Sequence, residues 1–441
     1  MTEQYIEYIL HKTGVQIVSN LIVVGEFEYL LSRIMGVVMK DLLRAMIRYD
    51  ILRSLSFNAE NGGWMDLGLT EIQQMLKNSA REFLSQECPL TLVRELEESN
   101  KGYSETLWKQ VVSLGWTGLV FPEEFGGTGA NFADLAVLLE EMGRSLLPTP
   151  FFSSVVLGGL TVLDAGSDLQ KQEVIPGVCD GSHILTVAML EEEGSYQPWG
   201  VHMTATSQGD NYVLNGTKLF VPDADVAHSV LVVARTTESD DANSGITIFV
   251  VPMDNEGITV SLLNSIGGER HCEMHFNNVT VPKGNVIGNV DLGWPIVEKM
   301  LQRAVAANCI EMLGGAEAVL DMTVEYAKQR TQFGRPIGSF QAIQHHCANM
   351  ASDVEGSRHM AYHAAWRISE NLQCAREVSM AKVWITGAYA RVCSTAHQCH
   401  GAIGFTKEHN LQLYTRRAKV QQLMYGDVHD HKATVLEHID D

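Results

Sequence analysis

The sequence predicts an α+β protein with three parts: an N-terminal helical domain, a middle β-barrel or β-sandwich domain, and a C-terminal four-helix bundle. Apolar residues recur at helical spacing from residue 66 to about 180 and again from Gly293 onward. Between them, residues 183 to about 285 form short alternating runs separated by turn residues. We place the domain boundaries at 65–182, 183–290 and 291–441, and regard residues 1–64 as an atypical extension.

The first domain contains three helical patterns, EIQQMLKNSAREFL, SETLWKQVVSLG and ADLAVLLEEMGRSL. The glycine-rich stretch FPEEFGGTGANFAD lies between two of them, and we interpret it as a structural turn.

The middle domain opens with NYVLNGTKLFV, in which an Asn-Gly pair separates two alternating runs and predicts a β-hairpin. Further strands are predicted at SVLVVAR, ITIFVVP, ITVSLL and CEMHFNNVTVP. Long helical patterns then follow Gly293 and predict a bundle.

Residues 1–64 contain apolar runs that do not fit this pattern. Our hypothesis is that translation starts at Met65, because Gly62-Gly63 just upstream can be encoded by a purine-rich ribosome-binding site. The alternative is a helical extension used for docking. Mass spectrometry of the natively expressed protein separates them, since a peptide from residues 1–60 would rule out the start at Met65.

The charge and the cysteine content of the chain limit the binding partners and the cellular location that can be expected. The chain of 441 residues has a formal net charge of -21, which disfavours nucleic acid and anionic lipid. Its eight cysteines form no CxxC pair, which favours a reduced, cytoplasmic protein. No uninterrupted apolar stretch is long enough to span a bilayer, so no membrane insertion is expected.

Two blocks carry the chemistry: RTQFGRPIGSFQAIQHH, from Arg330, and QCHGAIGFTKEHN, from Gln398. A guanidinium is a planar fork suited to pyrophosphate, and glycine lets the backbone approach a phosphate. Either block alone is typical of a helix end. Together, at this spacing, they resemble the C-terminal domain of the acyl-CoA dehydrogenase family, in particular a bacterial subgroup with AEMLGG-like and YGD- or FGD-like motifs.

The resemblance implies an FAD cofactor, an acyl-CoA substrate, α,β-dehydrogenation to the 2-enoyl-CoA, and electron transfer to an electron-transferring flavoprotein. It also implies a homotetramer or an α2β2 heterotetramer, because FAD in this family is held across subunits. The FAD-binding residues implied are Arg330, Gln332, Phe333, Gln398, Gly401, Gly404, Thr406 and Glu408.

The middle domain departs from the family. AMLEEEGSYQPWG stands where many members have a TEPxxGSD-like loop against the flavin ring, and LFVPDADVAH replaces their Trp-x-Thr/Ser strand. In this domain the candidate contacts with the flavin ring are Leu190 and Val221, through the backbone or by packing.

The expected catalytic base is also missing. Dehydrogenation needs a carboxylate to remove the α-proton, but Tyr425 stands at the position where most members carry Glu. Ala304 stands at the position that other members use. Two carboxylates remain as candidates: Glu311, among apolar residues of the same helix as Ala304, and Asp427, close after Tyr425.

Each candidate has a structural alternative: Glu311 as a buried carboxylate bonded to a neighbour, and Asp427 as a helix N-cap. If neither is the base, the chain is a non-catalytic or partly catalytic partner subunit of a heteromeric dehydrogenase. An acyl-CoA oxidase or a flavin monooxygenase would keep the fold and change the chemistry.

Histidine pairs and basic clusters are two further patterns in this part of the sequence. His397 and His400 form an HxxH pair, but no acidic or cysteine ligand is suitably spaced, so no metal site is predicted. Arg416, Arg417 and Lys419 form a basic cluster that suits either an anionic ligand or a solvated helix surface.

Overall fold

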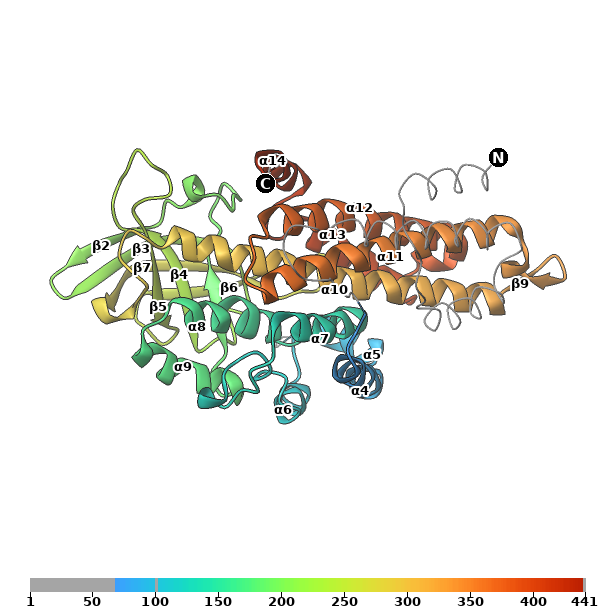
Figure 1. Cartoon of the computed structure of the whole chain (residues 1–441), viewed down its shortest axis with the longest axis horizontal. Coiled ribbons are helices and arrows are strands. Elements are labelled where there is room, and N and C mark those ends of the chain that lie inside the picture. Colours follow the sequence, from blue (N-terminus) through green and yellow to red (C-terminus); the bar gives the residue numbers. More distant parts are fainter. Residues whose placement is uncertain (1–67, 100–101, 439–441) are drawn as a thin grey trace, which may run out of the picture. The chain divides into compact units, whose positions relative to one another are not determined.

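The computed structural model describes residues 68–99 and 102–438. The hypotheses on residues 1–64 and on a start at Met65 lie outside these residues. Within the described part, helices come first, then strands, then helices again (Figure 1). The predicted fold class is therefore confirmed.

The N-terminal helices begin at side chains that cap them. Thr70 and Gln73 form a capping box at the start of α4, and Asn131 and Asp134 form one at the start of α7. A π-helical segment, Phe152–Gly159, leads directly into α8. The helices of this part are α4 (Glu71–Glu87), α5 (Leu90–Glu97), α6 (Glu105–Ser113), α7 (Phe132–Ser145), α8 (Leu160–Ala165) and α9 (Asp168–Cys179).

The middle part is one curled sheet with strand order β6-β7-β3-β2-β4-β5-β8, in which β1 pairs in parallel with β4. Side chains of β3 and β7 share one apolar core with those of β4 and β5, so the sheet wraps around that core. The opposite face of β4 and β5 packs against the helices. The strands are β1 (Leu185–Ala188), β2 (Thr204–Gln208), β3 (Asn211–Pro222), β4 (Ser229–Arg235), β5 (Ile246–Pro252), β6 (Ile258–Leu263), β7 (His271–Pro282) and β8 (Val286–Ile287).

The hairpin predicted at Asn215-Gly216 is wrong. β3 continues through this pair, and the turn between β2 and β3 instead includes Gly209, whose φ is 60°. The β3–β7 pairing shifts register between Leu214 and Gly216, and a Cβ on Gly216 would lie 2.8 Å from the Met203 side chain. The glycine therefore serves a bulge and a close approach, two roles that a glycine inside a strand commonly has.

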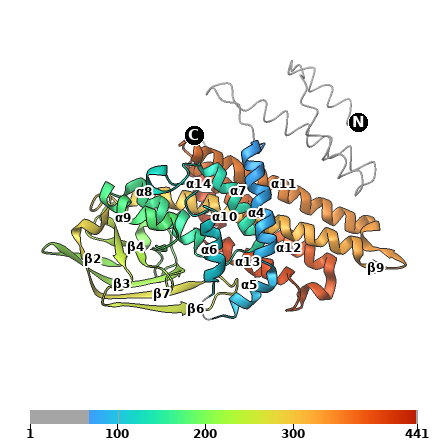
Figure 2. The same ribbon diagram turned by 90° about the horizontal axis from the view of Figure 1, so that it is seen from below.

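The C-terminal part is a bundle of α10, α11, α12 and α13, with α14 packed on α12. Both ribbon views show the β9–β10 hairpin at the end of the bundle away from the sheet (Figures 1 and 2). Its turn residues, Phe333 and Gly334, have φ of 53° and 78°, as a two-residue type I′ turn requires. The elements are α10 (Trp294–Gln329), β9 (Thr331–Gln332), β10 (Arg335–Pro336), α11 (Gln341–Ser369), α12 (Ala375–His400), α13 (Leu411–Leu423) and α14 (Val428–Glu437).

A buried ionic network joins α7 to α4 and α11. The fully buried carboxylate of Glu140 accepts hydrogen bonds from Lys77 at 2.9 Å and from the Tyr362 hydroxyl at 2.6 Å, and it also contacts Arg358. Burial by itself would raise the pKa of Glu140, but the charges of Arg358 and Lys77 and the Tyr362 hydrogen bond lower it to about 2. The network therefore holds a charged carboxylate inside the helical core.

Candidate active site

A cavity lies where the three parts of the chain meet. It encloses about 820 Å³, part of it open to solvent. One wall is the start of the π-helical segment, a conformation that often occurs at functional sites. The residues that line it include Thr149, Phe152, Ser153, Asp223, Glu269, Arg270, His271, Glu311, Arg417, Gln421 and Tyr425.

Glu311 reaches this cavity from the middle of α10. Two glycines fix its position, because α7 and α10 touch through their backbones there. A Cβ on Gly143 would lie 2.2 Å from the Glu311 carbonyl oxygen, and one on Gly314 would lie 1.9 Å from the Glu140 carbonyl oxygen. Any larger residue at either position would push the helices apart and move Glu311.

Glu311 is half-buried, and among the described residues its carboxylate accepts one hydrogen bond, from the Gln421 amide at 3.3 Å. Burial raises its pKa to about 7, with Arg417 and Gln421 acting against the rise and Glu269 adding to it. Glu311 is thus a carboxyl group that exchanges its proton near neutral pH and faces a cavity.

Tyr425, at the family's usual base position, is 8% exposed and lies against Phe152 and Tyr196, each with its ring centroid 5.8 Å away. Burial raises its pKa well above the usual value, and the nearby charges of Glu311 and Asp223 add to the rise. Such a phenol is no base at neutral pH. Ala304, at the second family position, is fully buried in the core.

Asp427 does not join Glu311. It is the N-cap of α14, and its side chain accepts from the amides of His429 at 2.7 Å and Asp430 at 3.1 Å. The Asp430 amide is the main cause of a lowered pKa at Asp427. Asp427 is also absent from the residues that line the cavity.

Asp427→Ala is therefore expected to lower the free energy of unfolding by about 1 kcal/mol, the usual cost of losing an N-cap. The rate of flavin reduction by an acyl-CoA is expected to stay unchanged. Denaturation and stopped-flow absorbance measure the two effects, and a lost reaction in a folded, flavin-loaded variant would contradict this assignment.

A second, smaller cavity adjoins the first. It encloses about 340 Å³, part of it open to solvent, and Tyr425 and Pro222 line both cavities. Its walls are mainly apolar and include Leu190, Leu219 and Met300. An apolar slot beside the sheet fits a flavin ring. Val221 does not line it; this residue is buried in the core of the sheet.

Arg330, Gln332 and Phe333 lie at the end of α10 and in the hairpin after it, and all three are exposed. Phe333 is 92% exposed. An arginine, an amide and an aromatic ring exposed side by side suit a ligand, or a neighbouring chain, that covers them.

The second block follows the end of α12. Gly401 has φ of 65° and open space around its Cβ position, whereas a Cβ on Gly404 would lie 3.1 Å from the His400 side chain. The His400 ring stacks on Tyr326, one turn before Arg330, with ring centroids 4.4 Å apart. This contact brings the two blocks together. Gln398, Thr406 and Glu408 are exposed around the loop.

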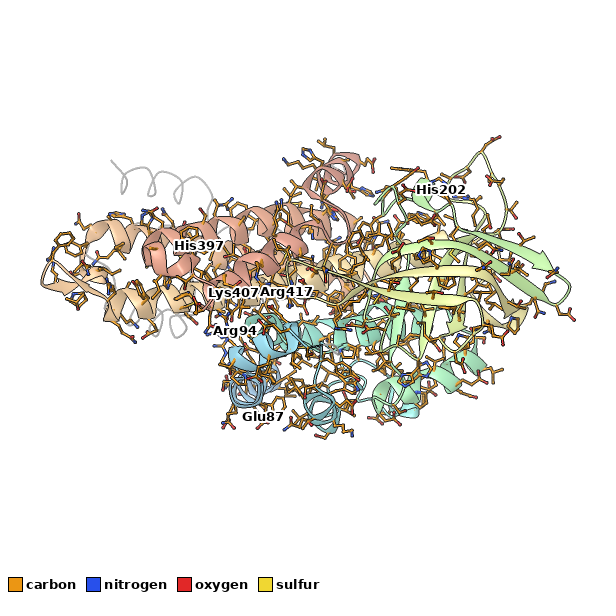
Figure 3. All side chains as sticks on the ribbon, turned by 180° about the vertical axis from the view of Figure 1, so that it is seen from behind. Glu87, Arg94, His202, His397, Lys407 and Arg417 are labelled. Carbon is orange, nitrogen blue, oxygen red and sulfur yellow. The ribbon has the colours of Figure 1, made fainter. Side chains whose placement is uncertain are left out.

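Arg94 of α5 holds the loop from the other side. It donates to the carbonyl oxygens of Lys407 at 2.6 Å and Glu408 at 3.1 Å, and Figure 3 shows Arg94 and Lys407 close together. The open space beside Gly401, the exposed guanidinium of Arg330 and the exposed amide of Gln398 are groups that suit a diphosphate such as that of FAD.

The histidines of the HxxH pair have other contacts. His397 bonds with the Thr415 hydroxyl at 2.9 Å and stacks on Phe405, and His400 bonds with the Ala396 carbonyl oxygen. No group of three or more His, Cys, Asp or Glu residues in the described parts of the chain could hold a metal ion.

The three side chains of the basic cluster, Arg416, Arg417 and Lys419, have different partners. Arg416 pairs with Glu97 at 2.8 Å, whereas Arg417 pairs with Glu269 at 2.7 Å and lines the larger cavity. Within the described residues, the Lys419 ammonium group bonds only with the Gln422 side chain, at 3.2 Å, on the exposed side of α13. Of the cluster, only Arg417 belongs to the site.

Asp223 was missed by sequence reasoning. It follows β3 in the left-handed region, with φ of 52°, and its half-buried carboxylate accepts from the Ser153 hydroxyl at 2.5 Å. Burial raises its pKa to about 7. The available signal was the Pro-Asp pair at a strand end, since Asp tolerates this conformation better than most residues.

Helices, a sheet and a helical bundle surround a cavity with a protonatable carboxyl group, an apolar slot adjoins this cavity, and the bundle carries a loop suited to a diphosphate. This arrangement is that of a flavin-dependent oxidoreductase. Sequence models of the acyl-CoA dehydrogenase N-terminal, middle and C-terminal domains match residues 70–182, 186–279 and 291–439. The chain belongs to the acyl-CoA dehydrogenase family. It is an FAD flavoprotein and an oxidoreductase acting on acyl-CoA.

Two relatives illustrate the similarity. The probable acyl-CoA dehydrogenase YngJ of Bacillus subtilis is 31% identical over 367 residues, which cover 82% of this chain and 96% of YngJ. The caffeyl-CoA reductase-Etf complex subunit CarC of Acetobacterium woodii is 29% identical over 362 residues, which cover 81% of this chain and 95% of CarC.

Two solved structures share the fold. Butyryl-CoA dehydrogenase from Megasphaera elsdenii superposes with a TM-score of 0.80 at 27% identity, covering 86% of this chain and 100% of the other. The ChsE4–ChsE5 complex from Mycobacterium tuberculosis gives a TM-score of 0.78 at 28% identity, covering 86% and 99%. No helix in the described residues is both long enough and apolar enough to span a membrane.

Proposed function

We propose that this protein dehydrogenates an acyl-CoA thioester to the 2-enoyl-CoA, with Glu311 as the catalytic base. The observation that carries this proposal is the placement of Glu311. Its carboxyl group faces the larger cavity with a pKa near 7, while both positions that the family commonly uses hold residues unable to act.

In the proposed reaction the Glu311 carboxylate takes the α-proton of the thioester. Burial makes this carboxylate a stronger base, which narrows the gap to the weakly acidic α-carbon. FAD, when bound, accepts the hydride from the β-carbon. Gln421 holds the carboxylate at 3.3 Å, and Phe152 and Tyr196 pack against Tyr425 at the boundary between the two cavities.

For the cofactor, we propose that the flavin ring occupies the smaller cavity, where Leu190 contributes to the wall. The diphosphate would be held by the two blocks at the end of the bundle. The proposed contacts are Arg330, Gln332, Phe333, Gln398, Gly401, Gly404, Thr406 and Glu408.

We also propose an electron-transferring flavoprotein as the electron acceptor and a homo- or α2β2 hetero-oligomer as the assembly. CarC is named as a subunit of a complex with Etf, and ChsE4–ChsE5 is a complex of two proteins. The strong exposure of Phe333 and of Phe405, at 92% and 73%, supports an assembly that covers the flavin-binding end of the bundle.

Anaerobic titration of the purified holoprotein with a panel of acyl-CoAs tests the activity. Bleaching of the flavin band and formation of the 2-enoyl-CoA are the expected results. Flavin that stays oxidised with every acyl-CoA would overturn the proposal and favour a partner subunit. Fast reoxidation of the reduced flavin by oxygen would instead indicate an oxidase or a monooxygenase.

The reaction should depend on pH through Glu311. Only the deprotonated carboxylate can take a proton, and its pKa is about 7. The rate constant of flavin reduction should therefore fall about tenfold per pH unit below 7 and level off above it. Asp223 has a similar pKa and could cause the same pH dependence, so the measurement is repeated on Asp223→Asn. Its profile should match that of the wild type if Glu311 is the group that titrates. A profile that moved with Asp223 would contradict the assignment to Glu311.

A further inference from the structure

Two hydrogen-bond acceptors in the larger cavity have no partner among the described residues. His271 is 7% exposed, and its Nδ1 donates to the Phe220 carbonyl oxygen at 3.2 Å. In the neutral ring Nε2 is then a bare acceptor. This Nε2 is buried with no hydrogen-bond partner among the described residues.

Asp223 adds a second acceptor. One of its carboxylate oxygens, Oδ2, accepts from the Ser153 hydroxyl, and in the described part of the chain Oδ1 has neither a hydrogen bond nor an ion pair. The left-handed backbone at Asp223 and its hydrogen bond to Ser153 hold this carboxylate at the cavity wall. The hydroxyls of Thr149 and Tyr425, also in this wall, are buried without partners in the described residues, and each can either donate or accept a hydrogen bond.

Both guanidinium groups of the cavity are already paired with a carboxylate, each through part of its N–H groups. Arg270 pairs with Asp225, and Arg417 pairs with Glu269 at 2.7 Å and donates to the Gly267 carbonyl oxygen at 3.2 Å. None of these bonds joins a guanidinium group to Asp223 or to His271. A purely alkyl ligand would leave the acceptors unpaired, and burying polar groups without partners is unfavourable.

We propose that the acyl group of the substrate carries a hydrogen-bond donor, a hydroxyl or an ammonium group, that is bound by Asp223 together with His271. The proposal rests on the proposed dehydrogenation, because it places the acyl group in the cavity that Glu311 faces. It makes Asp223 a specificity-determining residue and predicts that unsubstituted alkyl-CoAs are the poorer substrates.

The test compares acyl-CoAs of one chain length: hexanoyl-CoA, 6-hydroxyhexanoyl-CoA and 6-aminohexanoyl-CoA, with the four-carbon set beside them. Dissociation constants come from the change in the flavin spectrum, and kcat/KM from flavin-coupled turnover. A hydroxyl or amino compound should be favoured over its alkyl counterpart by roughly 10- to 100-fold in the wild type.

Two variants of Asp223 test whether this residue causes the preference and whether the preferred donor is a hydroxyl or an ammonium group. Asp223→Leu should abolish or reverse the preference, whereas the control Asp427→Asn, which changes a carboxylate outside the cavity, should keep it. Asp223→Asn should keep a preference for hydroxyl and lose one for ammonium, because the amide oxygen still accepts but carries no charge. Flavin content and melting temperature confirm that each variant is folded.

The outcomes are distinct. If the wild type binds and oxidises the alkyl, hydroxyl and amino compounds equally well, the inference is overturned, even if each of them bleaches the flavin. An equal loss with all three compounds in Asp223→Leu also overturns it, since Asp223 would then serve the CoA part or the flavin. Failure of every acyl-CoA to bleach the flavin overturns the proposed dehydrogenation, whereas the binding constants still decide on Asp223.

Discussion

Glu311→Gln is expected to lower the rate of flavin reduction by an acyl-CoA roughly 10²- to 10⁴-fold, the usual contribution of a positioned general base. Glutamine has nearly the same shape and can keep the contact with Gln421, which lies 3.3 Å from the carboxylate. It cannot accept the α-proton. Binding of acyl-CoA should therefore persist, and stopped-flow absorbance with a spectral binding titration separates the two effects.

Asp427→Asn is the matched control, because Asp427 is the other carboxylate near the end of α13 and its side chain caps α14. Its rate of flavin reduction should match that of the wild type. If Glu311→Gln kept the full rate, Glu311 would not be the base. If it lost flavin or unfolded, Glu311 would instead be a structural carboxylate, the alternative that the sequence left open.

The second large effect concerns stability. Glu140→Ala should lower the free energy of unfolding by roughly 3 kcal/mol, because it removes the buried carboxylate that Arg358, Lys77 and the Tyr362 hydroxyl share. Arg358 keeps its contact with Glu317 and Lys77 keeps the one with Glu141, which limits the loss. Glu325→Ala is the control. Its salt bridge to Lys328 joins side chains that are 58% and 57% exposed, and such pairs contribute little.

The stabilisation by Glu140 should depend on pH with a definite sign. Its pKa in the folded protein, about 2, lies below the value of about 4.3 for an unperturbed Glu. The charged form is thus the one that the fold stabilises, fully above the unfolded pKa and progressively less as pH falls toward 2. Urea denaturation of wild type and Glu140→Gln at several pH values should show their difference shrinking below pH 4. A constant difference would mean that packing, not charge, is what the substitution removes.

The sequence was sufficient for the order of the three parts, because helical and alternating periodicities differ over long stretches. It failed at Asn215-Gly216, where local turn chemistry predicted a hairpin. In the structure this pair lies inside a long strand that is paired with β7 over most of its length. The long-range pairing outweighs the local preference, and a single sequence does not display such pairing.

The candidate site was predictable where one residue was out of place in its pattern. Glu311 is a carboxylate among apolar residues of a helix, and this conflict is visible in the sequence. Asp223 follows the end of β3 and His271 begins β7, and only the folded sheet aligns these two neighbouring strands. Their unpaired acceptors could not be inferred, because unpaired status depends on every neighbour in three dimensions.

The central claim is that Glu311 removes the α-proton, and one measurement tests it apart from the redox step. A 3-thia-acyl-CoA has sulfur in place of the β-carbon, so it has no β-hydride to give, but it keeps acidic α-protons. Incubated with the holoprotein in D₂O, it should exchange its α-protons for deuterium, as followed by mass spectrometry. Rapid exchange is expected in the wild type and in Asp427→Asn, and little exchange in Glu311→Gln. Undiminished exchange in Glu311→Gln would contradict the central claim and place the base elsewhere.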